Sequence, residues 1–249
     1  RISQVNGMCT LSQSKAFDVA MFRMSLAMAA EGGGEDEEDK DKKEEKKDEK
    51  KKEDKEKKKA EPMIDGMPES FVGPMMAELA CHEVGHTLGL RHNFKASAVY
   101  TMAEINSNEL KGQKPHAGSV MDYLPANMNL KDGEVQGDYT MITVGPYDIW
   151  AIEYGYTQDE KALKDILSRV AEPELQYATD EDTFGPDPLA RRYDFSKQPL
   201  DYAKNQIRIA VHNRGRLIDK LVKEGDSWAK ARKGNEMTLS MQLRAVSMM

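Results

Sequence analysis

Apolar residues recur every three or four positions along several stretches of this chain, and strand-like alternation is almost absent. A repeat of this period predicts helices that bury one face. We expect helices over residues 13–30, 74–88, 148–154, 163–170, 201–224 and 237–249. The chain is therefore predicted to be predominantly α-helical.

The same pattern predicts which side of a helix is buried. In the first helix the apolar face comprises Phe17, Ala20, Met24 and Ala27. In the helix 201–224 it comprises Ile207, Val211, Ile218 and Leu221. Gly225 suits the stop of that long helix, and Pro74 suits the first turn of its own helix. We expect Leu79 and Leu88 to supply the buried side of the helix 74–88.

One segment dominates the charge pattern. Residues 35–59 contain 13 acidic residues and 12 lysines and no apolar residue. Such a segment stays solvated, and we expect a disordered insertion, with a lone helix held by ion pairs as the alternative. The rest of the chain holds 30 acidic and 24 basic residues, which gives no reason to expect nucleic-acid binding. No stretch is long and apolar enough to span a membrane, and the 16 methionines suit helix faces as adaptable core filler.

The candidate chemistry lies in one eleven-residue window of the form HExxHxxGxxH. His82 and His86 are four residues apart, so on a helix their imidazoles point to the same side. Gly89 is placed to end that helix, and the following turn brings His92 in as a third nitrogen. Three neutral nitrogens with one open position are typical of catalytic Zn2+, whereas structural sites close with a fourth protein ligand. Glu83 stands beside the predicted metal and is the candidate general base.

A second segment, Ser119–Tyr123, follows after a polar stretch that we expect to be loop with at most one short helix. Together the two segments resemble the metzincin zinc metallopeptidases, which pair HExxHxxGxxH with a tight turn whose methionine lies beneath the metal. The resemblance implies that this methionine is Met121. It also implies that Tyr123 hydrogen-bonds the reaction intermediate. Taken alone, Met121 reads as core filler and Tyr123 as an ordinary half-buried tyrosine.

Longer runs over residues 82–97, 119–123 and 145–154 resemble one branch in particular, a group of large, mostly exported bacterial zinc-dependent metalloproteases. The resemblance is dense from Phe71 to Tyr156 and thin elsewhere. It implies an extracellular or periplasmic location, although no signal peptide is visible. A chain that opens on Arg1 is typical of a mature or excised piece.

Metzincins place a mostly parallel sheet before the active-site helix, and its edge strand aligns the substrate. Residues 1–80 show no strand pattern, so we expect that sheet upstream of this chain, in another chain, or missing. The fold class is therefore predicted as the C-terminal, zinc-bearing part of an α+β catalytic domain, followed by a helical C-terminal region. The parts are an N-terminal helix (1–34), the charged insertion (35–61), the zinc-binding core (62–156) and the helical region (157–249).

These residues predict the hydrolysis of peptide bonds in a protein or peptide substrate. Zinc makes water more acidic and polarises a carbonyl, while Glu83 accepts the water's proton and passes it to the leaving amine. Three alternatives stay open: a non-catalytic zinc-stabilised scaffold module, a fragment inactive without its upstream sheet, and a zinc hydrolase that acts on another kind of bond. The residues do not predict the oligomeric state.

Three further features have two interpretations each. Cys9 and Cys81 are too few for a disulfide framework. Cys81 is expected in the core, and a pairing of the two stays open. His116 is expected at the surface, with a substrate-side role as the alternative. The acidic stretch 179–187 is expected to be an exposed loop, with a calcium loop as the alternative.

Overall fold

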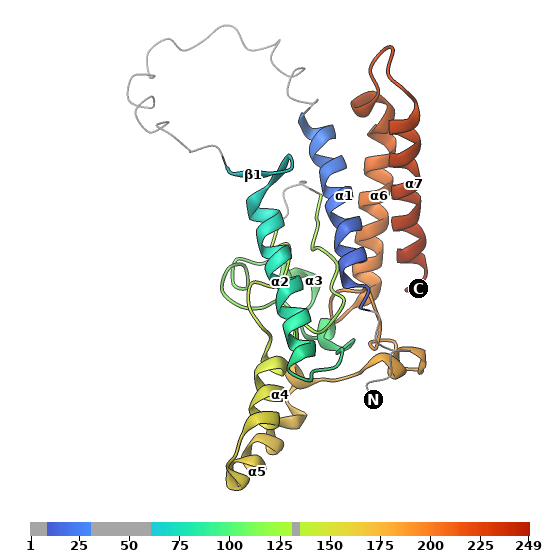
Figure 1. Ribbon diagram of the computed structural model, residues 1–249. Coiled ribbons are helices and arrows are strands. Elements are labelled where there is room, and N and C mark those ends of the chain that lie inside the picture. The colour runs from blue at the N-terminus through green and yellow to red at the C-terminus, as the bar shows by residue number, and fades with distance from the viewer. Residues whose placement is uncertain (1–8, 31–60, 131–134) are drawn as a thin grey trace, which may run out of the picture.

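The computed structural model describes residues 9–30, 61–130 and 135–249, so the charged run 35–59 lies outside the described residues. Over the described ranges the chain is mostly helical, and one short hairpin is its sheet (Figure 1). The elements are α1 (Leu11–Ala30), β1 (Met63–Ile64), β2 (Met67–Pro68), α2 (Glu69–Thr87), η1 (Ala96–Val99), α3 (Met102–Ile105), α4 (Pro146–Tyr156), α5 (Glu160–Ser168), η2 (Arg169–Ala171), η3 (Pro173–Leu175), η4 (Asp180–Phe184), α6 (Pro199–Leu221) and α7 (Ala229–Val246). The prediction of a predominantly α-helical chain is confirmed.

The N-terminal helix α1 lies side by side with the two C-terminal helices, α6 and α7, and α2 packs against α1 (Figure 1). The core between them is built largely from methionine. Its buried members include Met21, Met24, Met28, Met75 and Met241, together with Phe71, Ile209 and Leu217. Methionine has three rotatable bonds and fills irregular gaps, so this core accepts helix faces that are not regularly apolar.

Buried polar contacts also fix α1 against its neighbours. Lys15 Nζ on α1 lies 2.5 Å from Glu78 Oε2 on α2, and both side chains are almost fully buried. Asp18 accepts a hydrogen bond from the backbone N–H of Ala126 at 2.8 Å. Burial raises the pKa of Asp18 to about 6. Because a buried charge without its partner is costly, the Lys15–Glu78 pair fixes how α1 lies on α2, and the Asp18 contact fixes α1 to the loop at Ala126.

The helix α2 differs from the prediction at its start and on its buried side. It begins at Glu69, so Pro74 lies inside the helix rather than at its first position. Leu88 is 43% exposed, which contradicts the expected burial of this residue. The buried face instead comprises Phe71, Met75, Glu78, His82 and Gly85. Gly89 adopts a left-handed φ of +90° two residues after Thr87, the last residue of α2, as expected for a helix stop.

The long helix α6 was predicted with the wrong bounds and partly the wrong face. It ends at Leu221, four residues before Gly225, and the exposed fractions of Val211 and Ile218 are 53% and 57%. Its buried face comprises Tyr202, Ala203, Gln206, Ile209, Ala210, Asn213 and Leu217. Hydrophobicity alone does not identify this face, because small residues and amides occupy it. Asn213, for example, donates a hydrogen bond to the Ser25 hydroxyl of α1 at 3.1 Å.

The remaining helices are close to the prediction. The polar stretch after the motif holds one short α-helix, α3, and the C-terminal tail forms α7, which starts earlier than expected. On α1, Met24 is buried as predicted, whereas Ala27 is exposed. α4 and α5 pack together and project from the rest of the molecule (Figure 1). Across the described ranges, none of the helices combines the length and the apolarity that crossing a membrane requires.

Candidate metal centre

Three imidazoles meet at the C-terminal end of α2. His82 and His86 lie one turn apart on this helix, with ring centroids 4.7 Å apart. Gly89 then lets the chain turn back, so that the ring of His92 lies 5.4 Å from His82 and 4.7 Å from His86. The structure thus brings together the three histidines that the motif singles out.

Backbone carbonyls hold the first two rings. Nδ1 of His82 donates to the carbonyl oxygen of Val120 at 2.7 Å, and Nδ1 of His86 donates to that of Leu90 at 3.0 Å. A carbonyl oxygen only accepts, so the proton of each ring sits on Nδ1. Nε2 of both rings therefore keeps a free electron pair.

A carboxylate holds the third ring. Nδ1 of His92 donates to Asp180 Oδ2 at 2.9 Å, and Asp180 also accepts a hydrogen bond from Arg192. Nε2 of His92 is buried and has no hydrogen-bond partner among the residues that the structure describes. Metal-ligating histidines commonly carry such a hydrogen bond on the other nitrogen, because it fixes the tautomer and the ring orientation.

Burial keeps two of these imidazoles neutral. It lowers the pKa of His82 to about 4. It also lowers the pKa of His92, although the hydrogen bond to Asp180 acts in the opposite direction. Neutral imidazole is the form that binds divalent metals. Three imidazoles whose Nε2 atoms converge are therefore a donor set that fits zinc.

The two residues expected to act on a substrate differ in exposure. Glu83 follows His82 on α2 and is exposed. Tyr123 is buried, and its ring lies 4.7 Å from the ring of His92 and 5.7 Å from that of His82. Burial raises the pKa of the Tyr123 hydroxyl, so it keeps its proton at neutral pH.

Met121 packs against α2 at Gly85, one residue before His86. Its side chain is fully buried, and a Cβ on Gly85 would lie 2.3 Å from Met121 Sδ. Only glycine permits this approach. The carbonyl of Met121 accepts a hydrogen bond from the backbone N–H of Asn93 at 3.0 Å. Met121 therefore contacts both segments that carry the histidines.

The helix α4 supports the turn around Met121 through Asp148, a residue to which the sequence analysis gave no role. The Asp148 carboxylate accepts hydrogen bonds from the backbone N–H groups of Val120 and Gly145, at 2.8 and 2.7 Å, and from the Ser119 hydroxyl. A carboxylate at the third position of a helix commonly caps its start. Here the same carboxylate also fixes the preceding turn.

Cys9 is a fourth residue at the centre, and the sequence analysis missed it. Its Sγ lies 3.4 Å from His82 Nε2. One ligand atom from each of Cys9, His82, His86 and His92 lies within 4.8 Å of the others. Burial, and then the nearby Glu83 carboxylate, raises the pKa of the Cys9 thiol. No local pattern signals this position, because 73 positions separate Cys9 from His82.

Two expectations near the site are wrong. Cys81 is exposed on α2 rather than in the core, and both cysteines are free thiols, so they do not pair with each other. His116 is only 4% exposed and packs against the ring of Phe195 instead of lying at the surface. Burial lowers the pKa of His116 to about 3, which keeps this ring neutral.

The acidic stretch 179–187 pairs with cationic side chains rather than forming a calcium loop. Its ion pairs are Asp180–Arg192, Glu181–Arg91 and Asp187–Lys95. Most of the stretch is exposed, as expected, but Asp180 is buried, where it accepts the hydrogen bond from His92.

A family model described as Met-zincin matches residues 65–249, which is most of the chain. No curated protein and no solved structure matches. The matched range includes α2, the turn around Met121 and every helix that follows. Cys9 and α1 lie before it.

Proposed function

Because this chain belongs to the Met-zincin family, we propose that it is a zinc-dependent metalloendopeptidase acting on a protein or peptide substrate. His82, His86 and His92 hold the metal. The family match and the cluster of histidine and cysteine ligand atoms both support this assignment.

One observation carries the proposal: the free electron pairs of three imidazoles converge. Each Nδ1 donates to an oxygen, so in the neutral ring Nε2 carries the free electron pair. The buried Nε2 of His92 has no partner in the described part of the chain. A buried polar atom in this state costs free energy unless a ligand satisfies it, and a divalent metal does so.

A bound zinc ion supplies Lewis-acid chemistry, since it polarises a peptide carbonyl and lowers the pKa of water towards neutrality. Glu83 takes the proton of the attacking water and then returns it to the leaving amine, so that it acts first as base and then as acid. Its side chain is exposed, and the residue follows His82 directly on α2.

Tyr123 supplies a second stabilising group. Its hydroxyl accepts the backbone N–H of Thr10 at 3.0 Å, and it keeps its own proton because burial raises its pKa. Tyr123 donates that proton in a hydrogen bond to the carbonyl oxygen as negative charge develops there. Loss of one such donor typically lowers turnover about 10²-fold to 10³-fold, so Tyr123→Phe is expected to keep the metal and lose activity on this scale.

Two other functions predict different behaviour. A non-catalytic scaffold module would hold zinc and leave proteins intact, and its Glu83 would be dispensable. A hydrolase for another kind of bond would need Glu83 and would also leave proteins intact. The exposed carboxylate directly beside a ligand histidine favours a hydrolase over a scaffold, because a purely structural site does not use a base there.

Cleavage of casein, an unstructured protein, tests the proposal. We expect zinc-loaded protein to cut internal bonds, a chelator to stop cleavage and added zinc to restore it. The assay uses both the parent chain and Cys9→Ser, because the Cys9 thiol lies beside the ligand nitrogens. Intact casein with both zinc-loaded proteins contradicts the endopeptidase function.

Glu83→Gln is the matched variant, since the amide keeps the size of the side chain but does not accept the proton. We expect it to retain zinc and lose about 10²-fold to 10⁴-fold of the turnover. A rate near that of the parent removes Glu83 from the role of base.

A further inference from the structure

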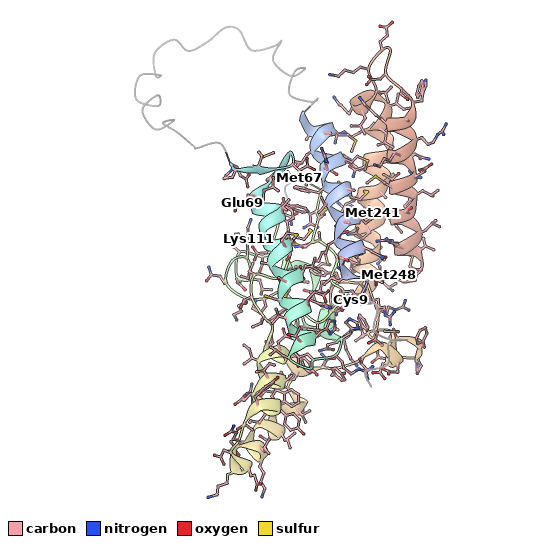
Figure 2. All side chains as sticks on the ribbon, viewed as in Figure 1. Cys9, Met67, Glu69, Lys111, Met241 and Met248 are labelled. Carbon is pink, nitrogen blue, oxygen red and sulfur yellow. The ribbon has the colours of Figure 1, made fainter. Side chains whose placement is uncertain are left out.

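The segment Cys9–Leu11 lies across the metal centre. Figure 2 places Cys9 at the lower end of α1, beside the C-terminal half of α2. Ligand atoms that share one tetrahedral zinc lie roughly 3.4–3.6 Å apart, given Zn–N and Zn–S bonds of about 2.0–2.3 Å. Cys9 Sγ lies 3.4 Å from His82 Nε2, which is the separation expected of two such atoms.

A second, independent observation concerns His92. Its side chain is 4% exposed, and its Nε2 is buried without a partner among the described residues. This nitrogen belongs to the group of four ligand atoms that lie within 4.8 Å of one another, and the sulfur of Cys9 is the fourth. The centre therefore gathers four candidate ligand atoms, one sulfur and three nitrogens.

We propose that Cys9 is the fourth protein ligand of this centre, and that the segment Cys9–Leu11 closes the site. The proposal rests on the proposed function, because it concerns the same metal. On binding, the Cys9 thiol releases its proton to solvent and the thiolate takes the coordination position that catalysis requires for water.

The contacts of the next two residues hold the segment in place. Thr10 N–H donates to the Tyr123 hydroxyl at 3.0 Å, and the hydroxyl groups of Thr10 and Tyr193 lie 2.5 Å apart. Leu11 is fully buried against Phe94 and Tyr123. The segment therefore covers the side chain proposed to stabilise the reaction as well as the metal position. Peptide hydrolysis requires Cys9 to leave, so this segment regulates the site.

Cobalt substitution tests the ligand set without measuring activity. Co2+ bound by a thiolate gives a sulfur-to-metal charge-transfer band in the near ultraviolet, and tetrahedral coordination gives intense visible bands. We expect both in the parent chain. Cys9→Ser should lose the charge-transfer band and keep the metal on its three histidines. Cys81→Ser is the matched control, since this free thiol is exposed one residue before His82, and it should keep the band.

The outcomes separate the two proposals. If the parent binds no cobalt, both the metalloenzyme and the Cys9 ligand are wrong. If it gives visible cobalt bands without the charge-transfer band, or if Cys9→Ser keeps that band, only the Cys9 ligand is overturned.

Thiol labelling of the unaltered chain tests the same ligand without a substitution, so its result does not depend on whether Cys9→Ser folds. The chain has two cysteines. With zinc bound we expect one of them, Cys81, to react with a thiol reagent, and after chelation we expect both to react. Two reactive thiols in the zinc-loaded chain overturn the proposal.

Closure itself is tested with acetohydroxamate, a small ligand that binds zinc-type metals at an open position. It should change the cobalt spectrum of Cys9→Ser at lower concentration than that of the parent or of Cys81→Ser. An equal response from all three proteins overturns the closure.

Discussion

The metal end of α2 and the layer formed by α1, α6 and α7 are held together differently. At the metal end, Gly85 lies in direct contact with Met121, and the carboxylate of Asp148 accepts three hydrogen bonds around one turn. In the helical layer, flexible methionines fill the core, and a Cβ added to the exposed Gly215 of α6 would meet no atom within 4 Å. Close approach and satisfied polar groups leave little tolerance for change, whereas methionine packing adapts.

The largest effect is expected where the two regions join. Lys15→Met leaves Glu78 buried without its partner, and breaking a buried pair typically costs about 3–5 kcal/mol of unfolding free energy. Urea unfolding measures the loss. The double variant Lys15→Met/Glu78→Met removes both charges and should recover most of it. A single variant as stable as the parent would show that this pair does not hold α1 to α2.

The next effect lies inside the metal end. Gly85→Ala places a methyl group 2.3 Å from Met121 Sδ, so the buried Met121 side chain must shift. We expect a loss of about 1–3 kcal/mol, typical of an overpacked site, together with weaker zinc binding. Thermal unfolding and zinc titration measure the two effects. Unchanged values would mean that the Met121 side chain repacks against α2 at no cost.

The three histidines at the metal end could be predicted from the sequence because they lie within eleven consecutive residues. The spacing of His82, His86 and His92 defines one side of a helix and one turn, and the structure brings these rings together. Sequence reasoning missed Cys9 and Asp180, which arrive from far along the chain. Such contacts depend on tertiary packing and leave no periodic signal.

The helical layer teaches the opposite lesson. The spacing of apolar residues predicted that these helices exist, but it did not predict which face of α6 is buried. Val211 and Ile218 point outward while Gln206 and Asn213 are buried, because neighbouring helices on two sides select small and amide side chains. A periodic apolar pattern therefore predicts that a segment is helical more reliably than it predicts which face of the helix packs against its neighbours.

A smaller effect concerns pH. The pKa of His116 is about 3 in the folded chain, below its ordinary value of 6.5. Above pH 6.5 the ring is neutral in both states. Below it the unfolded chain binds a proton that the folded chain does not, so stability falls as pH falls. Between pH 7 and pH 5.5 we expect this residue to contribute a loss of about 1 kcal/mol.

His116→Leu is the matched variant for this pH effect, because leucine fills the site without titrating. Its unfolding free energy should depend less on pH over the same interval. Identical slopes for parent and variant would contradict the neutral, buried state of His116.

The smallest effect is expected in the helical layer. Gly215 is exposed within α6, and a Cβ there meets no atom within 4 Å. Gly215→Ala should therefore stabilise the chain by about 0.5–1 kcal/mol through helix propensity. Thermal unfolding checks the sign. A loss as large as that of Gly85→Ala would erase the distinction between the two regions.

Zinc content tests the central claim most directly. Elemental analysis of the purified parent chain should find one zinc per chain, and Glu83→Gln should retain it because Glu83 is not a ligand. His86→Gln should bind zinc far more weakly than the parent, since it lacks one of the three imidazole ligands. A parent chain that binds no zinc, or a His86→Gln chain that holds zinc as tightly as the parent, would contradict the account.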